Sequence, residues 1–387
     1  MPVLRLLAAA ALVAACGPIR HVPTEPRLLL ADGRASAGAE AAAGAGGGRL
    51  RLAVYGDSRG NRDIHRAVVA AMVADRPDVV IFTGDALECF PAGHLPDYAG
   101  WSLLIPLWPQ YHRGYPAASL LSLVPFPALL HETVGAPFAH VRDSDGFNAF
   151  LEDTAPLRDA GIPLLFAPGN HDLYHRWDRA EVARLFAQGD GAGRGAERLW
   201  FSADVSGWRL VILDTGTDLL GDVDPMPAGG AQLQWLEEIL ADAERRGLRS
   251  IVTLHLPPFS SAREDGSVPW VRERVVRGVL DRHRVELVLN GHAHAYERLE
   301  EPGLEGRPVT YVVTGGGGSS FFHVAEEREP GSLLFVEGVP HFVRLDLGPD
   351  GIRGEMIPVS VGGAPVPARD VFEVRSAASG ERSPTAR

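Results

Sequence analysis

Five short clusters of polar side chains follow apolar segments of the sequence, and together they contain the donors of a metal site. The clusters are Gly56-Asp57, Gly84-Asp85, Gly169-Asn170-His171-Asp172, His255 and Gly291-His292-Ala293-His294. Carboxylate, amide oxygen and imidazole suit divalent first-row metals better than thiophilic ones. Each cluster alone is weak evidence for a metal site, because a Gly-Asp pair is often only a turn and a lone His is more often structural than a ligand. The His292-x-His294 pair is stronger, since alternate residues of an extended segment reach one region.

The ordered set of clusters is suited to two metal ions that lie close together. Such a pair needs a bridging carboxylate, and an Asp at the end of a strand can supply it. Two adjacent metals bind a phosphate oxygen, lower the pKa of a bridging water and stabilise an in-line displacement. The donor set therefore points to phosphate chemistry.

Strands alternating with helices must position these clusters. The hydrophobic pattern predicts strands at 50–55, 79–83, 163–167, 208–213, 251–254 and 285–289, with helices at 61–75, 178–188, 230–246 and 268–283. Beyond residue 300 the pattern becomes β-rich, at 309–314, 341–347 and 352–359. Alternation of this kind predicts an α/β fold, in which ligands bind beyond the carboxyl ends of the strands. All five clusters stand at such ends.

The composition excludes several classes of protein. The chain has 387 residues, with 37 basic residues against 49 acidic ones and a net charge of −12. Every basic residue is Arg, and an acidic chain without Lys is a poor candidate for binding a nucleic-acid backbone. The two Cys cannot form a disulfide framework or a thiolate zinc site.

The N-terminus has the pattern of an export signal. Residues 1–15 carry one positive charge followed by about ten apolar residues, too few to span a membrane. They lead into Cys16, and the segment Val13-Ala14-Ala15-Cys16 resembles a bacterial lipobox and predicts lipid attachment at Cys16. The protein is therefore expected to be an exported bacterial lipoprotein, anchored in a membrane and facing the periplasm or the outer membrane. A plain secretory signal, with Cys16 accidental, is the alternative.

The remainder of the chain divides by composition. Residues 16–48 are rich in Ala, Gly and Pro and predict a flexible tether. A catalytic domain is expected over 49–372, followed by a frayed tail at 373–387. Within it, residues 88–145 break the α/β rhythm with many Pro, Trp and Tyr, and predict an inserted lid beside the site. The alternative is a loop that packs away from the site.

The complete pattern resembles the calcineurin-like metallophosphoesterase superfamily over residues 49–347. The segments that begin at His255 (HLPPFSS), Gly291 (GHAHAYER) and Tyr311 (YVVTGGGG) resemble its purple acid phosphatase branch in particular. The resemblance implies a four-layer α/β/β/α sandwich, with two mixed sheets facing each other and helices outside.

The resemblance also implies a ligand set. Asp57 and His294 would bind metal one, and Asp85 would bridge both metals. Metal two would be completed by Asn170, His255 and His292. The implied cofactors are two divalent or mixed-valence ions of Mn, Fe or Zn.

The implied reaction uses two further residues of the third cluster. His171 would hydrogen-bond the phosphate and protonate the leaving alkoxide, and Asp172 would orient His171. A metal-bridging hydroxide would attack phosphorus in line.

Two positions depart from the superfamily pattern. Arg59 stands where most members have a His ligand, and Arg stays protonated, so it is expected to bind substrate phosphate instead. Glu88 stands where the purple branch supplies a Tyr, so the purple colour is expected to be absent. Glu88 is a further candidate ligand that would replace the missing one at metal one. The alternative is that metal one lacks a ligand and is bound weakly.

The sequence thus predicts an exported phosphoesterase that hydrolyses phosphate monoesters or diesters. Its partners would be a phosphate ester and, through the lipid on Cys16, a membrane; no nucleic acid is expected. One competing hypothesis is a surface lipoprotein of the same fold that binds a metal or ligand with little or no catalysis. Another is a nuclease of the same superfamily.

Overall fold

The computed structural model describes residues 49–87, 146–173, 178–186, 198–216, 226–360 and 367–375. Cys16, Glu88 and the predicted lid at 88–145 lie outside the described residues. Within those ranges, no helix is both long enough and apolar enough to cross a bilayer.

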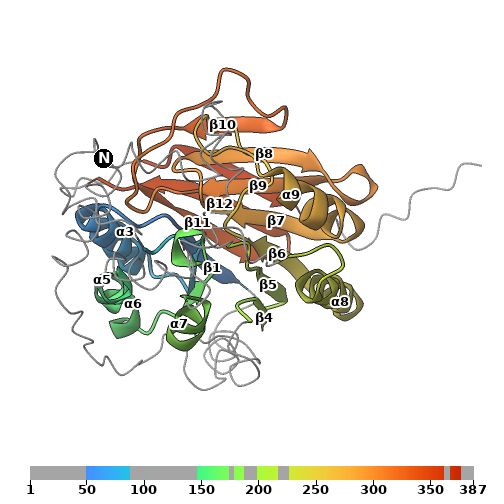
Figure 1. The fold of residues 1–387 in the computed structure, drawn as a ribbon, viewed down its shortest axis with the longest axis horizontal. Coiled ribbons are helices and arrows are strands. Elements are labelled where there is room, and N and C mark those ends of the chain that lie inside the picture. Colours follow the sequence, from blue (N-terminus) through green and yellow to red (C-terminus); the bar gives the residue numbers. More distant parts are fainter. Residues whose placement is uncertain are drawn as a thin grey trace, which may run out of the picture.

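Two mixed β-sheets form the centre of the molecule (Figure 1). The six-stranded sheet has the order β13-β12-β11-β1-β2-β3, and the seven-stranded sheet has the order β10-β8-β9-β7-β6-β5-β4. The strands of the first sheet are β1 (Leu50–Tyr55), β2 (Val79–Phe82), β3 (Leu164–Phe166), β11 (His341–Gly348), β12 (Gly351–Pro358) and β13 (Asp370–Arg375). Those of the second are β4 (Phe201–Val205), β5 (Trp208–Ile212), β6 (Arg249–Thr253), β7 (Val285–Asn290), β8 (Tyr296–Pro302), β9 (Pro308–Thr314) and β10 (Ser332–Val336).

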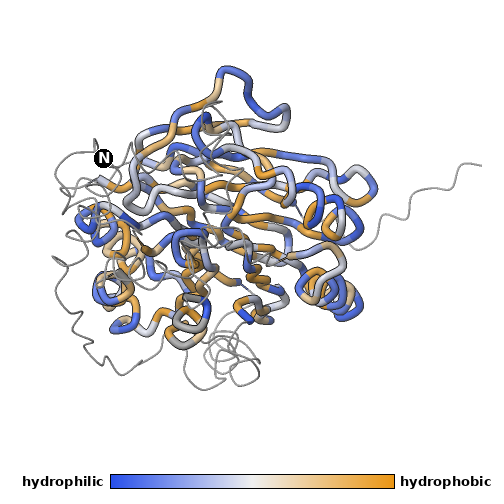
Figure 2. The backbone as a smooth tube through the Cα atoms, viewed as in Figure 1, coloured by the Kyte–Doolittle hydropathy of each residue, from blue (hydrophilic) through white to orange (hydrophobic). Residues whose placement is uncertain are grey.

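Helices cover the outer face of each sheet. On the first sheet these are α3 (Arg62–Asp75), α5 (Gly146–Asp153), α6 (Ala155–Asp159) and α7 (Asp178–Leu185); on the second they are α8 (Ala231–Arg246) and α9 (Pro269–Val271), which continues as a π-helix, Arg272–Arg277. One apolar core lies between the sheets, and one further core lies between each sheet and its own helices. Figure 2 shows hydrophobic residues concentrated along the strands. The predicted four-layer α/β/β/α sandwich is confirmed.

Local sequence explains where α3 begins and ends. The Asn61 side chain accepts hydrogen bonds from the amides of Asp63 and Ile64, which caps the N-terminus. The helix ends at Arg76, which adopts a left-handed conformation before Pro77. This helix fixes the chain between β1 and β2, the two strands that carry the first two polar clusters.

The strands that precede the clusters end at the same level. Tyr55 pairs with Phe82, and Phe82 pairs with Phe166, all in parallel register. In the other sheet, Thr253 pairs with Leu289. Parallel strands in register deliver the residues that follow them to one edge.

The structure corrects three details of the sequence prediction. Strands β4, β8, β10 and β13 were not predicted. The helix predicted over 268–283 is a series of short α, π and 3₁₀ turns interrupted at Gly278. There, a Cβ would lie 2.1 Å from the Arg274 carbonyl oxygen, so only Gly fits. The tail predicted from residue 373 starts inside β13, because Arg375 pairs with Gly351.

A buried carboxylate ties α3 to α5. Asp153, 4 % exposed, accepts hydrogen bonds from Arg62 and Arg66 and lies 3.4 Å from His65 Nδ1. Burial opposes its ionisation, but the hydrogen bonds from these three partners hold the pKa of Asp153 well below its usual range. A group with a depressed pKa stabilises the fold above its unfolded pKa and loses that contribution as the pH falls.

We predict that Asp153→Asn lowers the free energy of unfolding by about 3 kcal/mol at pH 7, because the arginines and His65 lose a buried anion. The difference from the parent is expected to shrink as the pH falls below about 4. Urea unfolding monitored by circular dichroism measures both effects. The control is Glu152→Gln, whose exposed pair with Arg62 is worth under about 1 kcal/mol. Equal stabilities of the two variants at pH 7 would contradict the role given to Asp153.

Candidate metal centre

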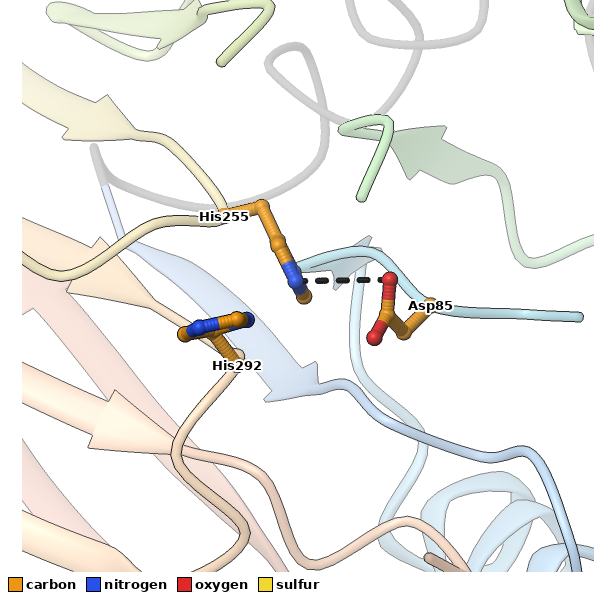
Figure 3. A group of neighbouring side chains, drawn as sticks. All are labelled: Asp85, His255 and His292. Atoms are coloured by element: carbon orange, nitrogen blue, oxygen red, sulfur yellow. Dashed lines mark ion pairs between the residues drawn. The ribbon is translucent and has the colours of Figure 1, made fainter. Parts of the chain in front are cut away.

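The structure brings donors from both sheets together at one point. His255 Nε2 lies 3.3 Å from Asp85 Oδ1, and His292 lies on the other side of the same space (Figure 3). The Asn170 Oδ1 atom is 3.0 Å from His255 Nε2 and 3.1 Å from His292 Nδ1. Four ligand atoms of the kinds that bind divalent first-row metals therefore converge.

The orientation of His255 is set by a backbone carbonyl. Its Nδ1 lies 2.8 Å from the Thr83 carbonyl oxygen. A carbonyl only accepts, so Nδ1 carries the proton and the lone pair of Nε2 points at Asp85 and Asn170. Lone pairs that face one another in a buried space repel unless a cation lies among them. The donor set of Asp85, Asn170, His255 and His292 therefore fits a metal ion.

Burial keeps the imidazoles of the site neutral. Desolvation is the largest cause in each case, and it lowers the pKa of His255 and His292 to about 4 and that of His294 to about 3. Only the neutral ring has a lone pair to offer a metal, so these side chains are ready to bind without first releasing a proton.

A second group of donors shares Asp85 with the first. Asp57, Asp85 and His294 place their ligand atoms within 4.8 Å of one another. His294 Nδ1 is 2.6 Å from the Ser320 carbonyl oxygen, so its Nε2 lone pair points inward, 3.5 Å from Asp57 Oδ1. Burial, the largest influence on Asp57, raises its pKa to about 7.

Arg59 lies within this second group. Its Nη2 is 3.2 Å from His294 Nε2, and its Nε is 3.3 Å from Asp85 Oδ2. The two candidate groups thus differ, because one contains ligand atoms alone and the other also contains a guanidinium.

The backbone is strained at three residues of the two groups. Asp57, Asp85 and His292 have φ of 58°, 63° and 69°, in the left-handed region that non-Gly residues seldom adopt. Gly84 directly precedes Asp85, and a Cβ there would lie 2.6 Å from His255 Nδ1. The backbone amide of His292 donates to both carboxylate oxygens of Asp57, which offsets part of the strain.

His171 lies at the edge of the donor group, beside Asp85. His171 Nε2 is 3.9 Å from Asp85 Oδ2, with the imidazole nearly buried. Burial is the largest cause, and Arg59 the next, of a pKa for His171 well below its usual value.

Asp172 does not have the surroundings that we predicted for it. Its Oδ2 accepts the amides of Asp85 and Gly169, and its Oδ1 accepts those of Ala86 and Leu87. Two amides on each oxygen fill the carboxylate's acceptor sites. Asp172 therefore holds the loop after β2 in place, and the predicted orienting bond to His171 is replaced by these four.

The described residues place nine predicted site residues together: Asp57, Arg59, Asp85, Asn170, His171, Asp172, His255, His292 and His294. Glu88 lies outside the described residues. Sequence reasoning missed the carbonyls of Thr83 and Ser320, which orient two of the imidazoles. A backbone carbonyl has no residue type, so no signal in the sequence marks it.

The fold is a four-layer sandwich, and a site made of several imidazoles and carboxylates lies between the strand ends of its two sheets. Together, this fold and this site define a metallophosphoesterase-type domain. The chain belongs to the calcineurin-like phosphoesterase family, whose sequence profile matches residues 50–296.

Curated relatives place the chain near the purple acid phosphatases. It is 29 % identical over 164 residues to purple acid phosphatase 22 of Arabidopsis thaliana, covering 40 % of this chain and 35 % of that protein. It is 28 % identical over 197 residues to probable purple acid phosphatase 20 of the same plant, covering 48 % of this chain and 44 % of the relative. The chain thus matches less than half the length of these relatives.

A solved structure agrees on the fold. Purple acid phosphatase PPD1 from yellow lupin aligns with a TM-score of 0.54 at 17 % identity, covering 85 % of this chain and 54 % of that one.

We predict that Asp172→Asn lowers the free energy of unfolding by about 3 kcal/mol, measured by urea unfolding with a chelator present. The amide side chain offers one acceptor oxygen and turns its NH₂ group toward backbone donors. Asp159→Asn, at the end of α6, is the control and should change stability by less than about 0.5 kcal/mol. If Asp172 served only to orient His171, stability would stay at the parent value and only a reaction rate would fall.

Proposed function

We propose that this protein is a metal-dependent phosphoesterase that hydrolyses phosphate monoesters or diesters. The observation that carries the proposal is the convergence of Asp85, Asn170, His255 and His292, whose ligand atoms lie 3.0–3.3 Å apart along three contacts. Membership of the calcineurin-like phosphoesterase family and the similarity to purple acid phosphatases support it.

These four side chains would hold a divalent ion of Mn, Fe or Zn. When bound, such an ion acts as a Lewis acid toward a phosphoryl oxygen and lowers the pKa of water at its open position. The protein's part is to keep the donors neutral or anionic, correctly oriented and shielded from solvent. The carbonyl of Thr83 orients His255, and the amide of His171 donates to Asp85 Oδ1 at 2.9 Å.

His171 is the proposed proton donor. It lies beside Asp85 at the edge of the donor group, close enough to reach a phosphate ester bound there. Its neutral ring donates a hydrogen bond to a phosphate oxygen, and the negative charge of that phosphate favours protonation of the ring. The protonated ring can then give its proton to the leaving alkoxide.

We predict that the purified protein, loaded with Mn, Zn or Fe, hydrolyses p-nitrophenyl phosphate or its bis ester. His171→Ala should keep the metal and reduce kcat at least about 100-fold, because a general acid contributes that much or more. His283→Gln, beside Glu237 and Glu244, is the control and should keep the parent rate. Absence of turnover with every metal, in protein shown to be loaded, would refute the proposal. Loss of metal from His171→Ala would refute the role given to His171.

A binding module that keeps the fold without hydrolysis is the second candidate. Arg59 favours it, since this side chain lies within 3.3 Å of two of the donors that a second metal would need. The turnover assay decides between the two functions.

On the N-terminal pattern alone, we also propose that the protein is exported and anchored by lipid on Cys16. We predict that the parent protein, expressed in a bacterium, enters the detergent phase in Triton X-114 partitioning. Cys16→Ser should move to the aqueous phase, whereas Cys89→Ser should remain with the detergent. Detergent partitioning that does not depend on Cys16 would rule out this anchor.

A further inference from the structure

We infer that the guanidinium of Arg59 takes the place of the second metal ion, so that the centre binds one divalent ion beside a fixed organic cation. This inference rests on the proposed metal-dependent function. It changes the expected composition of the site from two ions to one.

The contacts of Arg59 match those that a second ion would make. Arg59 Nε lies 3.3 Å from Asp85 Oδ2, and Arg59 Nη2 lies 3.2 Å from His294 Nε2. These are two of the three side chains of the second candidate group. A guanidinium has no lone pair and stays protonated, so it competes with a metal for these ligands and cannot itself be one.

Asp85 joins the two positions. Its Oδ1 accepts the amide of His171 and lies 3.3 Å from His255 Nε2, on the side of the first donor group. Its Oδ2 faces Arg59. The carboxylate is therefore a bridge, with a metal position on one side and an arginine on the other.

The backbone holds Arg59 in this position. The Ser319 amide donates to the Asp57 carbonyl, the Ser319 hydroxyl donates to the Arg59 carbonyl at 3.2 Å, and the Gly317 amide donates to the Gly56 carbonyl. The amides of Asp57 and Ser58 donate to the carbonyls of Gly84 and Asp85. Arg59 thus projects from a segment tied to two neighbouring loops, and its side chain is only 14 % exposed.

The orientation of His294 suits an arginine partner. Its Nδ1 proton is donated to the Ser320 carbonyl, which leaves Nε2 as an acceptor for Arg59 Nη2.

Counting bound metal tests this inference independently of turnover. Equilibrium dialysis against Mn²⁺, followed by elemental analysis, should give one ion per chain for the parent protein. Its electron paramagnetic resonance spectrum should be that of an isolated Mn²⁺ without spin coupling. Two ions per chain, or a spin-coupled pair, would overturn the inference.

Two His variants from the same loop sharpen the count. His292→Ala should lose the ion, with affinity reduced at least about 10-fold, whereas His294→Ala should still bind one. A centre with two ions would lose one ion in each variant, which would contradict the inference.

Arg59→Met supplies the positive test. It removes the charge at similar length, and the freed carboxylates and His294 should then bind a second ion. The control is Arg51→Met, which removes a charge from β1 at its contact with Asp346. This variant should still bind one ion per chain. If Arg59→Met also stayed at one ion, the guanidinium would not be what excludes the second metal. Absence of hydrolysis by a parent protein with one ion would refute the proposed function and leave this inference intact.

Discussion

The hydrogen bond between His255 Nδ1 and the Thr83 carbonyl is the contact on which the centre depends. Thr83 directly follows β2 of one sheet, and His255 follows β6 of the other, so this 2.8 Å bond joins the two halves of the sandwich at the site. It also selects the tautomer, which turns the Nε2 lone pair toward Asp85 and Asn170. The same contact therefore links the two sheets at the site and sets the tautomer of the ligand. The amide of His292, which donates to Asp57, makes a second link of this kind between β7 and β1.

Strain at the centre is concentrated where the ligands are. Three of the six described non-Gly residues with positive φ are Asp57, Asp85 and His292. These left-handed conformations lie two or three residues after the ends of β1, β2 and β7, in the loops that carry the donors. The four amides bound by Asp172 supply compensating stability to the loop that carries Asp85. A strained ligand loop is thus supported by a carboxylate that is itself outside the donor groups.

Sequence reasoning was most successful where chemistry and periodicity agree. The range of β1 and the grouping of the five polar clusters follow from apolar runs that end in Gly-Asp or His. Strand β8 was missed because Glu297 occupies one of its buried positions, where it accepts hydrogen bonds from Ser261 and Ser332. A charged residue at a core position hides the alternation that predicts a strand. The position of the Arg59 guanidinium was also beyond reach, since its partners are 26 and 235 residues away in the chain.

The hydrogen bond from the Ser319 amide to the Asp57 carbonyl connects residues that are separated by most of the domain in sequence. Strand β1 likewise lies between β2 and β11, so it lacks one of its two neighbours until the chain has reached Leu347. Contacts so distant in sequence cannot form until nearly all of the polypeptide is available. Metal affinity that requires the finished site therefore appears only at the end of folding. Any ion that the site binds is therefore drawn from the metals that are available where folding is completed.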